Sequence, residues 1–82
     1  MSKVDQIRQE IIDTIANLNK IPKEKIDPAV DFRDTELDSF ALVEVVFSLE
    51  NKYDVTFPQE TLYELRTINE LAELIEKILK EK

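Results

Sequence analysis

Apolar residues recur at steps of three and four positions along two long stretches of this chain, and this periodicity constrains the fold more than any other feature. Such spacing lines one face of an α-helix. It predicts helices over about residues 3–18 and 68–80, each with one apolar face to bury. The apolar positions are Val4, Ile7, Ile11, Ile15 and Leu18 in the first stretch, and Leu71, Leu74, Ile75, Ile78 and Leu79 in the second.

Two further helices are expected in the middle of the chain. Helical spacing predicts one from Asp38, whose short carboxylate suits an N-cap, to about residue 53. Its apolar positions are Phe40, Val43, Val46, Phe47, Leu49 and Tyr53. Pro58 suits a first helical turn and predicts a short helix over about 58–65. Val55-Thr56-Phe57 has β propensity, but a lone strand would have no partner, so we predict none.

The remaining segments complete an all-α prediction. Residues 19–37 contain two prolines and many large apolar residues, which predicts a long loop held against the core. These apolar residues are Ile21, Ile26, Val30, Phe32 and Leu37. Thr67 with Glu70, and Ser2 with Asp5, resemble capping boxes. We therefore expect a single domain over residues 1–82, a four-helix bundle with three main helices, a short third helix and a long loop between helices 1 and 2.

Composition limits the chemistry available to this chain. Its 82 residues include no histidine and no cysteine. This excludes Ser-His-Asp and Cys-His nucleophile systems, disulfides and cysteine- or histidine-bound zinc. A chain this short also builds only a modest core. We expect no catalysis and no metal site. Because no apolar run approaches the roughly 20 residues of a membrane span, and the start lacks a signal peptide, we expect a cytoplasmic, monomeric protein outside the membrane.

The net charge of −7 is concentrated in the middle of the chain. Residues 34–64 contain eight acidic residues and one lysine, whereas acids and bases balance in both flanking segments. This distribution predicts one acidic surface rather than a uniformly acidic protein. It argues against nucleic acid as a partner, because phosphate binding needs a basic face.

The segment Glu36-Leu37-Asp38-Ser39-Phe40-Ala41-Leu42-Val43-Glu44, followed by Leu49-Glu50, Tyr53-Asp54 and Phe57-Pro58, resembles an acyl carrier protein. In that family an Asp-Ser-Leu triplet opens the second helix, and a transferase moves 4′-phosphopantetheine from coenzyme A to the serine. The resemblance implies that Ser39 carries this group and that Asp38 caps the helix and helps the Mg²⁺-dependent modification. A serine at a helix start suits an attached phosphodiester, because the unpaired N–H groups there favour an anion. Both residues are also ordinary cap residues.

The resemblance also implies a face for docking partner enzymes. These partners are the phosphopantetheinyl transferase and the acyl- or aminoacyl-loading and biosynthetic enzymes, with basic patches that would meet acidic residues on and beyond the second helix. The expected docking residues are Leu42, Val43, Glu44, Glu50 and Asp54. Each acid taken singly fits a solvated helix face equally well.

The sequence departs from the family pattern near Ser39. Phe40 replaces the usual leucine and is expected to pack under the helix start. Ala41 and Leu42 stand where fatty-acid carriers often have an acid and a polar residue, which favours a specialised carrier. Phe47 and Tyr63 allow two interpretations. They are either core aromatics or bulk that shrinks a cavity and favours a short, polar or aminoacyl cargo.

Two other functions compete with carriage of a thioester-linked intermediate. A carboxylate hydrolase using Asp38 and Glu44 is disfavoured, because a bundle this small offers little cleft. The serious alternative is a helical protein-interaction adaptor without a prosthetic group. An adaptor should tolerate Ser39→Ala, whereas a carrier should not.

Overall fold

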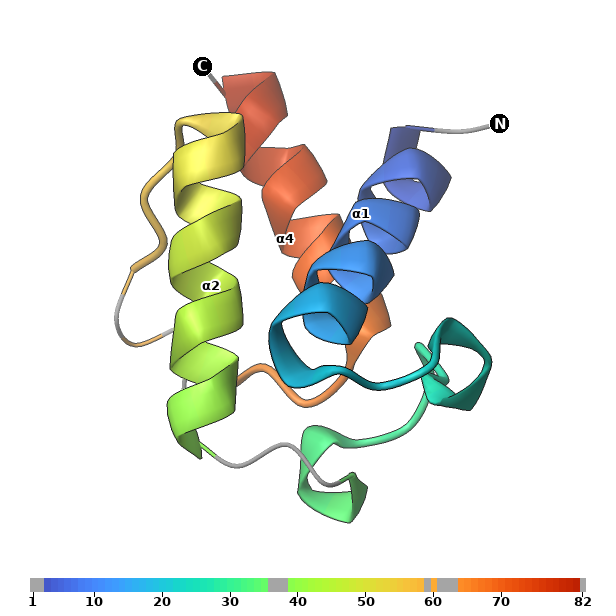
Figure 1. Cartoon of the computed structure of the whole chain (residues 1–82). Coiled ribbons are helices and arrows are strands. Elements are labelled where there is room, and N and C mark those ends of the chain that lie inside the picture. The colour runs from blue at the N-terminus through green and yellow to red at the C-terminus, as the bar shows by residue number, and fades with distance from the viewer. Residues whose placement is uncertain (1–2, 36–38, 59, 61–63, 82) are drawn as a thin grey trace.

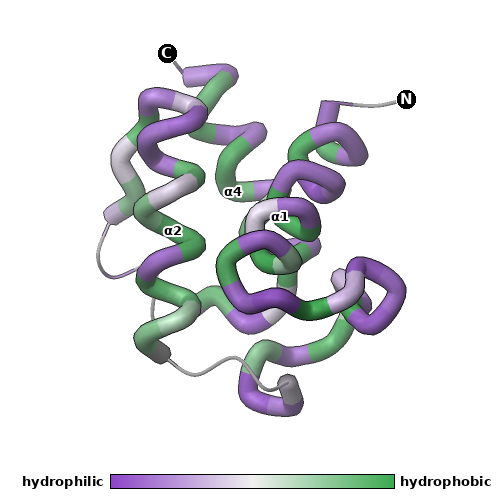
Figure 2. Tube along the Cα trace, in the orientation of Figure 1, coloured by the Kyte–Doolittle hydropathy of each residue, from purple (hydrophilic) through white to green (hydrophobic). Residues whose placement is uncertain are grey.

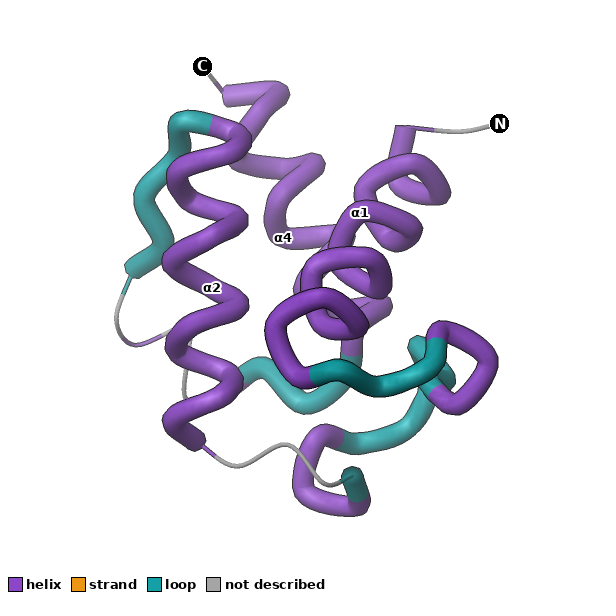
Figure 3. Tube along the Cα trace, viewed as in Figure 1, coloured by secondary structure: helices purple, strands orange, loops and turns teal. Residues whose placement is uncertain are grey.

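The structure, a computed structural model, describes residues 3–35, 39–58, 60 and 64–81. Its elements are α1 (Lys3–Asn19), the 3-10 turns η1 (Lys23–Lys25) and η2 (Phe32–Asp34), α2 (Ser39–Tyr53) and α4 (Ile68–Glu81) (Figure 1). The described residues form helices, turns and loops and contain no strand (Figure 3). The all-α prediction is therefore confirmed, and the three long helices begin and end within a residue or so of their predicted limits. Of the predicted helix over 58–65, residues 59 and 61–63 lie outside the described residues, and residues 60 and 64 are helical.

Helix α1 is the element against which the other two long helices pack. Its buried residues point to both neighbours, and together the three helices form one apolar cluster. The buried residues of the cluster on these helices are Ile7, Ile11 and Ile15 on α1, Val45, Val46 and Leu49 on α2, and Ile68, Leu71, Ala72 and Ile75 on α4. Leu18 does not belong to this core: its side chain is 44% exposed, because the apolar face of α1 ends one turn earlier than its spacing suggested.

The loop between α1 and α2 is held against the bundle, as predicted. Phe32 is buried in the core. Two backbone hydrogen bonds fix the loop to the chain around the start of α4: the Phe32 amide donates to the Arg66 carbonyl over 2.6 Å, and the Asn69 amide donates to the Pro28 carbonyl over 3.1 Å. Such bonds satisfy backbone groups that burial would otherwise leave unpaired. The two 3-10 turns within the loop were not predicted.

Helices α1 and α2 both end in a Schellman motif built without glycine. Lys20 and Asp54, the residues just past each helix, have φ of 55°, in the left-handed region that glycine usually fills. One residue further on, the Ile21 and Val55 amides donate to carbonyls five positions back, over 3.2 and 3.1 Å. The chain contains no glycine, so ordinary residues occupy both positions.

The capping box at the start of α4 is confirmed, with one difference. The Glu70 amide donates to Thr67 Oγ1 over 3.1 Å, as the motif requires. In return Glu70 Oε2 accepts from the Arg66 amide over 2.9 Å, one residue before the expected one. The carboxylate therefore also fixes the segment that leads into the helix. The second expected box involves Ser2, which lies outside the described residues.

Candidate functional site

Ser39 is the first residue of α2. The unpaired N–H groups of a first helical turn and the positive end of the helix dipole favour an anion at this point. The first turn of α2 carries no acidic side chain that would oppose one. A phosphodiester on Ser39 therefore fits this helix start. Asp38, the predicted cap, lies outside the described residues, as does the Ser39 side chain.

Helix α2 carries two separate apolar stripes, and the lower part of the helix is mostly hydrophobic in Figure 2. The inner stripe packs against α1 and consists of Leu42, Val45, Val46, Leu49 and Tyr53. The outer stripe faces solvent and consists of Phe40, Val43 and Phe47, which are 72%, 46% and 61% exposed. These three residues recur at steps of three and four, so they share one helix face. The face begins one residue after Ser39.

The outer stripe corrects two expectations. Phe40 does not pack under the helix start, and Phe47 does not belong to the core. An exposed Phe47 also cannot fill the bundle interior, so the idea that it shrinks a cargo cavity is wrong for this residue. Tyr63, the other aromatic in that argument, lies outside the described residues.

The predicted docking residues differ in how exposed they are and in what they contact. Val43 and Glu44 are exposed on α2, whereas Leu42 is half-buried against the core. Glu50 is half-buried, and its Oε2 accepts a hydrogen bond of 2.9 Å from the Phe57 amide. Its carboxylate thus holds the turn that follows α2. Asp54 is exposed at the left-handed position that ends the helix.

The acidic middle of the chain is largely solvent-facing where it is described. Of its acids, Asp34, Glu44, Asp54, Glu60 and Glu64 are exposed. Lys52, its one lysine, pairs with Glu10 of α1, and the hydrogen bond to that carboxylate raises the pKa of the ammonium. This lysine therefore binds an acid from outside the acidic segment.

Sequence reasoning missed the outer stripe, although a signal for it was present. Of the first nine residues of α2, only Ser39 and Glu44 are polar, so helical spacing alone fits more than one face. A helix that is apolar on opposite sides is either fully buried or has a second surface to cover. A bundle of this size cannot bury both sides of α2, and that argument would have identified an exposed stripe.

Among the residues that the structure describes, no helix is long and apolar enough to cross a membrane.

A small helical bundle with a serine at the start of a helix, and with an exposed apolar stripe beside it, fits a carrier domain. Comparison with known proteins agrees with this class. The family model described as "Phosphopantetheine attachment site" matches residues 9–75. An acyl carrier protein of Brachyspira hyodysenteriae is 34% identical over 79 residues, which cover 94% of this chain and 96% of the relative.

Two further similarities extend this result. Acyl carrier protein 5, chloroplastic, of Arabidopsis thaliana is 28% identical over 81 residues, and the match covers 93% of this chain but only 58% of that protein. The solved structure of an acyl carrier protein from Enterococcus faecalis superposes with a TM-score of 0.73 at 18% identity, covering 94% of this chain and 99% of that one. Because the sequence identity is only 18%, this structural similarity shows a shared fold and nothing more.

The chain belongs to the acyl carrier protein family of phosphopantetheine-binding proteins. It is a carrier rather than an enzyme, it serves fatty-acid or related biosynthesis, and its prosthetic group is a covalently attached 4′-phosphopantetheine. Members of this family act with a phosphopantetheinyl transferase and with biosynthetic enzymes. The group supplies the thiol that this cysteine-free chain lacks.

Proposed function

We propose that Ser39 is the residue that carries 4′-phosphopantetheine and that this chain transports a thioester-linked acyl or aminoacyl intermediate on it. The observation that carries the proposal is the position of Ser39 as the first residue of α2, within the matched segment 9–75 and in a first turn free of acidic side chains. The helix dipole there stabilises a phosphodiester.

Attachment follows as a phosphoryl transfer to the serine hydroxyl. Ser39 Oγ forms a bond to the pantetheine-bearing phosphorus of coenzyme A, the bond from that phosphorus to 3′,5′-ADP breaks, and the nucleotide leaves. The hydroxyl proton passes to a base of the transferase. The carrier contributes position and tethering, which raise the effective concentration of the cargo at each partner.

Intact-protein mass spectrometry tests the assignment. Wild type, Ser39→Ala and Ser48→Ala are each incubated with coenzyme A, Mg²⁺ and a broad-specificity transferase. Ser48 is a matched control because it is also on α2, nine positions further on. We expect one added phosphopantetheine on wild type and Ser48→Ala and none on Ser39→Ala. Addition to folded Ser39→Ala would refute the site, and no addition to any folded variant would favour the adaptor alternative.

We also propose that partner enzymes dock on the exposed face of α2. The outer stripe lies beside Ser39, and exposed Glu44 lies on the same helix within one turn of Val43 and Phe47. A partner with an apolar cleft and a basic rim complements this face. Apolar contact would supply most of the affinity, and the acid would speed and orient the encounter. Glu50 contributes less than expected, because its carboxylate already binds the Phe57 amide.

A pair of exposed apolar residues provides the test. Phe47→Ser should lower kcat/KM of the transferase about tenfold, the loss expected when an aromatic leaves the centre of a small interface. Leu18→Ser removes a similarly exposed apolar side chain from α1 and should leave kcat/KM unchanged. Equal effects of the two substitutions would show that the outer stripe is not the docking face.

A further inference from the structure

The outer stripe of α2, formed by Phe40, Val43 and Phe47, begins beside Ser39. Phe40 follows Ser39 directly, and Val43 follows it by four positions, so Ser39 and Val43 adjoin on the helix surface. Phe47 lies one turn beyond Val43. At a rise of about 1.5 Å per residue, the stripe ends about 12 Å along the helix from Ser39. A group attached to Ser39 therefore starts at one end of the stripe.

The outer stripe is an apolar surface with little charge around it. Its three side chains are exposed and share one helix face, and contiguous exposed apolar patches of this kind mark binding sites. Glu44 is the acidic residue of the first two turns of α2. Lys52, the basic residue of α2, lies in the last turn and pairs with Glu10. An occupant of the stripe is therefore held by apolar contact rather than by an ion pair.

The groups of 4′-phosphopantetheine follow one another in an order that matches the residues of α2. The phosphate comes first, and the unpaired N–H groups of the helix start favour it. One methylene further along the arm is a carbon that bears two methyl groups, and these can reach the first turn, where Phe40 and Val43 are exposed. Two amide groups follow, and the ring of Phe47 offers them a flat apolar surface one turn later. The thiol then extends beyond the stripe.

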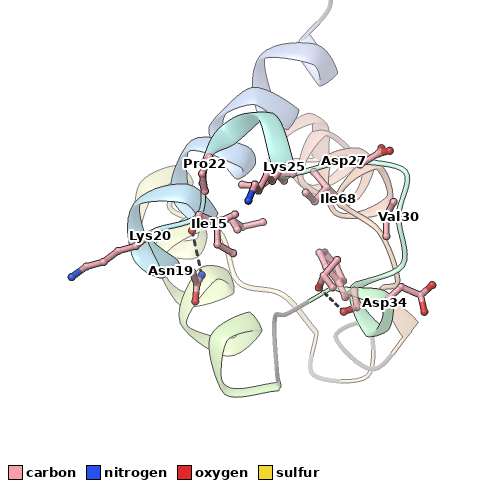
Figure 4. A pocket seen from close by; sticks show the side chains of 13 residues that line it. Ile15, Asn19, Lys20, Pro22, Lys25, Asp27, Val30, Asp34 and Ile68 are labelled. Carbon is pink, nitrogen blue, oxygen red and sulfur yellow. Dashed lines mark hydrogen bonds between the residues drawn. The ribbon is translucent and has the colours of Figure 1, made fainter.

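A second apolar surface competes for the arm at the end of the bundle where α1 ends and α2 and α4 begin (Figure 1). It is a pocket of about 460 Å³ between the end of α1, the loop that follows it and the start of α4 (Figure 4). The described residues that line it include Ile15, Ile26 and Ile68, and none of them belongs to α2. The two methyl groups of the arm are only a few bonds from Ser39, on α2. The outer stripe is therefore the nearer apolar surface for them.

We propose that the outer stripe is the resting site of the unloaded arm between encounters with partner enzymes. The inference rests on the proposed function and adds a contact within the carrier itself. Because the arm is tethered at one end of the stripe, its effective concentration there is about millimolar, so a contact too weak to form between separate molecules is populated. A partner that docks on the stripe must displace the arm. Docking thus releases the thiol when the partner is in place.

NMR of the arm in the unloaded carrier tests this contact. The transferase attaches ¹³C-labelled phosphopantetheine from coenzyme A, and intact mass confirms attachment before any spectrum is recorded. We expect the two arm methyl signals to move upfield of those in free coenzyme A, because they lie over aromatic rings, and to show nuclear Overhauser effects to the rings of Phe40 and Phe47. The double variant Phe40→Ser/Phe47→Ser should return both signals to their free positions. Leu18→Ser, which removes an exposed apolar side chain from α1, should leave them unchanged.

The remaining outcomes separate this inference from the proposed function. Arm methyl signals at their free positions in wild type, or Overhauser effects to Ile26 or Ile68 instead of the stripe, would refute the resting site and leave Ser39 as the attachment site. If folded wild type accepts no phosphopantetheine, the proposed function fails, and titration with free pantetheine decides on the stripe. Saturable shifts of the Val43 methyl signals that the double variant abolishes would support a site for the arm, and their absence would refute it.

Discussion

Lys20→Gly should stabilise this protein, because Lys20 ends α1 with φ of 55°. A side chain with a Cβ in the left-handed region costs about 1–2 kcal/mol relative to the right-handed one. Glycine avoids this penalty but loses more conformational entropy on folding, by about 0.4–1 kcal/mol. The difference is a net gain of about 0.5–1 kcal/mol. For a domain of this size, that raises Tm by about 2–8 °C.

Lys20→Ala is the control that isolates the backbone contribution. It removes the same ammonium but keeps the Cβ, so it should be no more stable than wild type. Urea unfolding followed by helical circular dichroism measures all three proteins, with the slope of free energy against urea concentration required to stay constant. Lys20→Gly should exceed Lys20→Ala by about 1 kcal/mol. Equal stability of the two variants would refute the argument that the Schellman turn of α1 is strained.

Three further predictions concern single contacts. Glu50→Ala should lower the free energy of unfolding by about 1–2 kcal/mol, because it leaves the Phe57 amide without its carboxylate acceptor; urea unfolding measures this. The pKa of the Asp31 carboxyl is lowered to about 2, mainly by the hydrogen bond from the Arg33 side chain and further by the one from the Arg33 amide. The stability that the ionised carboxylate contributes should therefore be complete above pH 4 and lost as pH falls through 2. Carboxyl NMR titration of wild type and Arg33→Met should show a higher Asp31 pKa in the variant. Thr67→Ala should cost about 1 kcal/mol at the α4 cap, and unchanged thermal stability would contradict this.

The sequence predicted α1 and α4 well because each has one apolar face and a polar remainder. Their spacing therefore determines both the helix and the side that is buried. For α2 the same reasoning gave the correct helix limits but assigned the wrong residues to the buried face, because Phe40 and Phe47 are as apolar as the residues that pack against α1. Periodicity identifies a helix, but it cannot choose between two apolar faces without the positions of the neighbouring helices.

Other features of the site depended on tertiary structure or on backbone angles. The bond from the Phe57 amide to Glu50 joins residues seven apart, across a turn that no short motif specifies. The left-handed positions at Lys20 and Asp54 carry no sequence signal, because glycine, the usual marker, is absent from the chain. The pocket beside Phe32 depends on how far the loop stands from α1, which the loop's composition does not determine.

The two faces of α2 should separate folding from partner recognition in one pair of variants. Val45 is 1% exposed, so Val45→Ala removes two buried methyl groups and should cost about 2 kcal/mol of stability. Phe47 is 61% exposed, so Phe47→Ser should change the free energy of unfolding by less than about 0.5 kcal/mol. Transferase kinetics measured well below the melting temperature should rank the variants in the opposite order, with Phe47→Ser impaired and Val45→Ala close to wild type. If the free energy of unfolding and kcat/KM of the transferase fall together in both variants, the outer stripe supports the fold. Its exposed aromatics would then need an explanation other than docking.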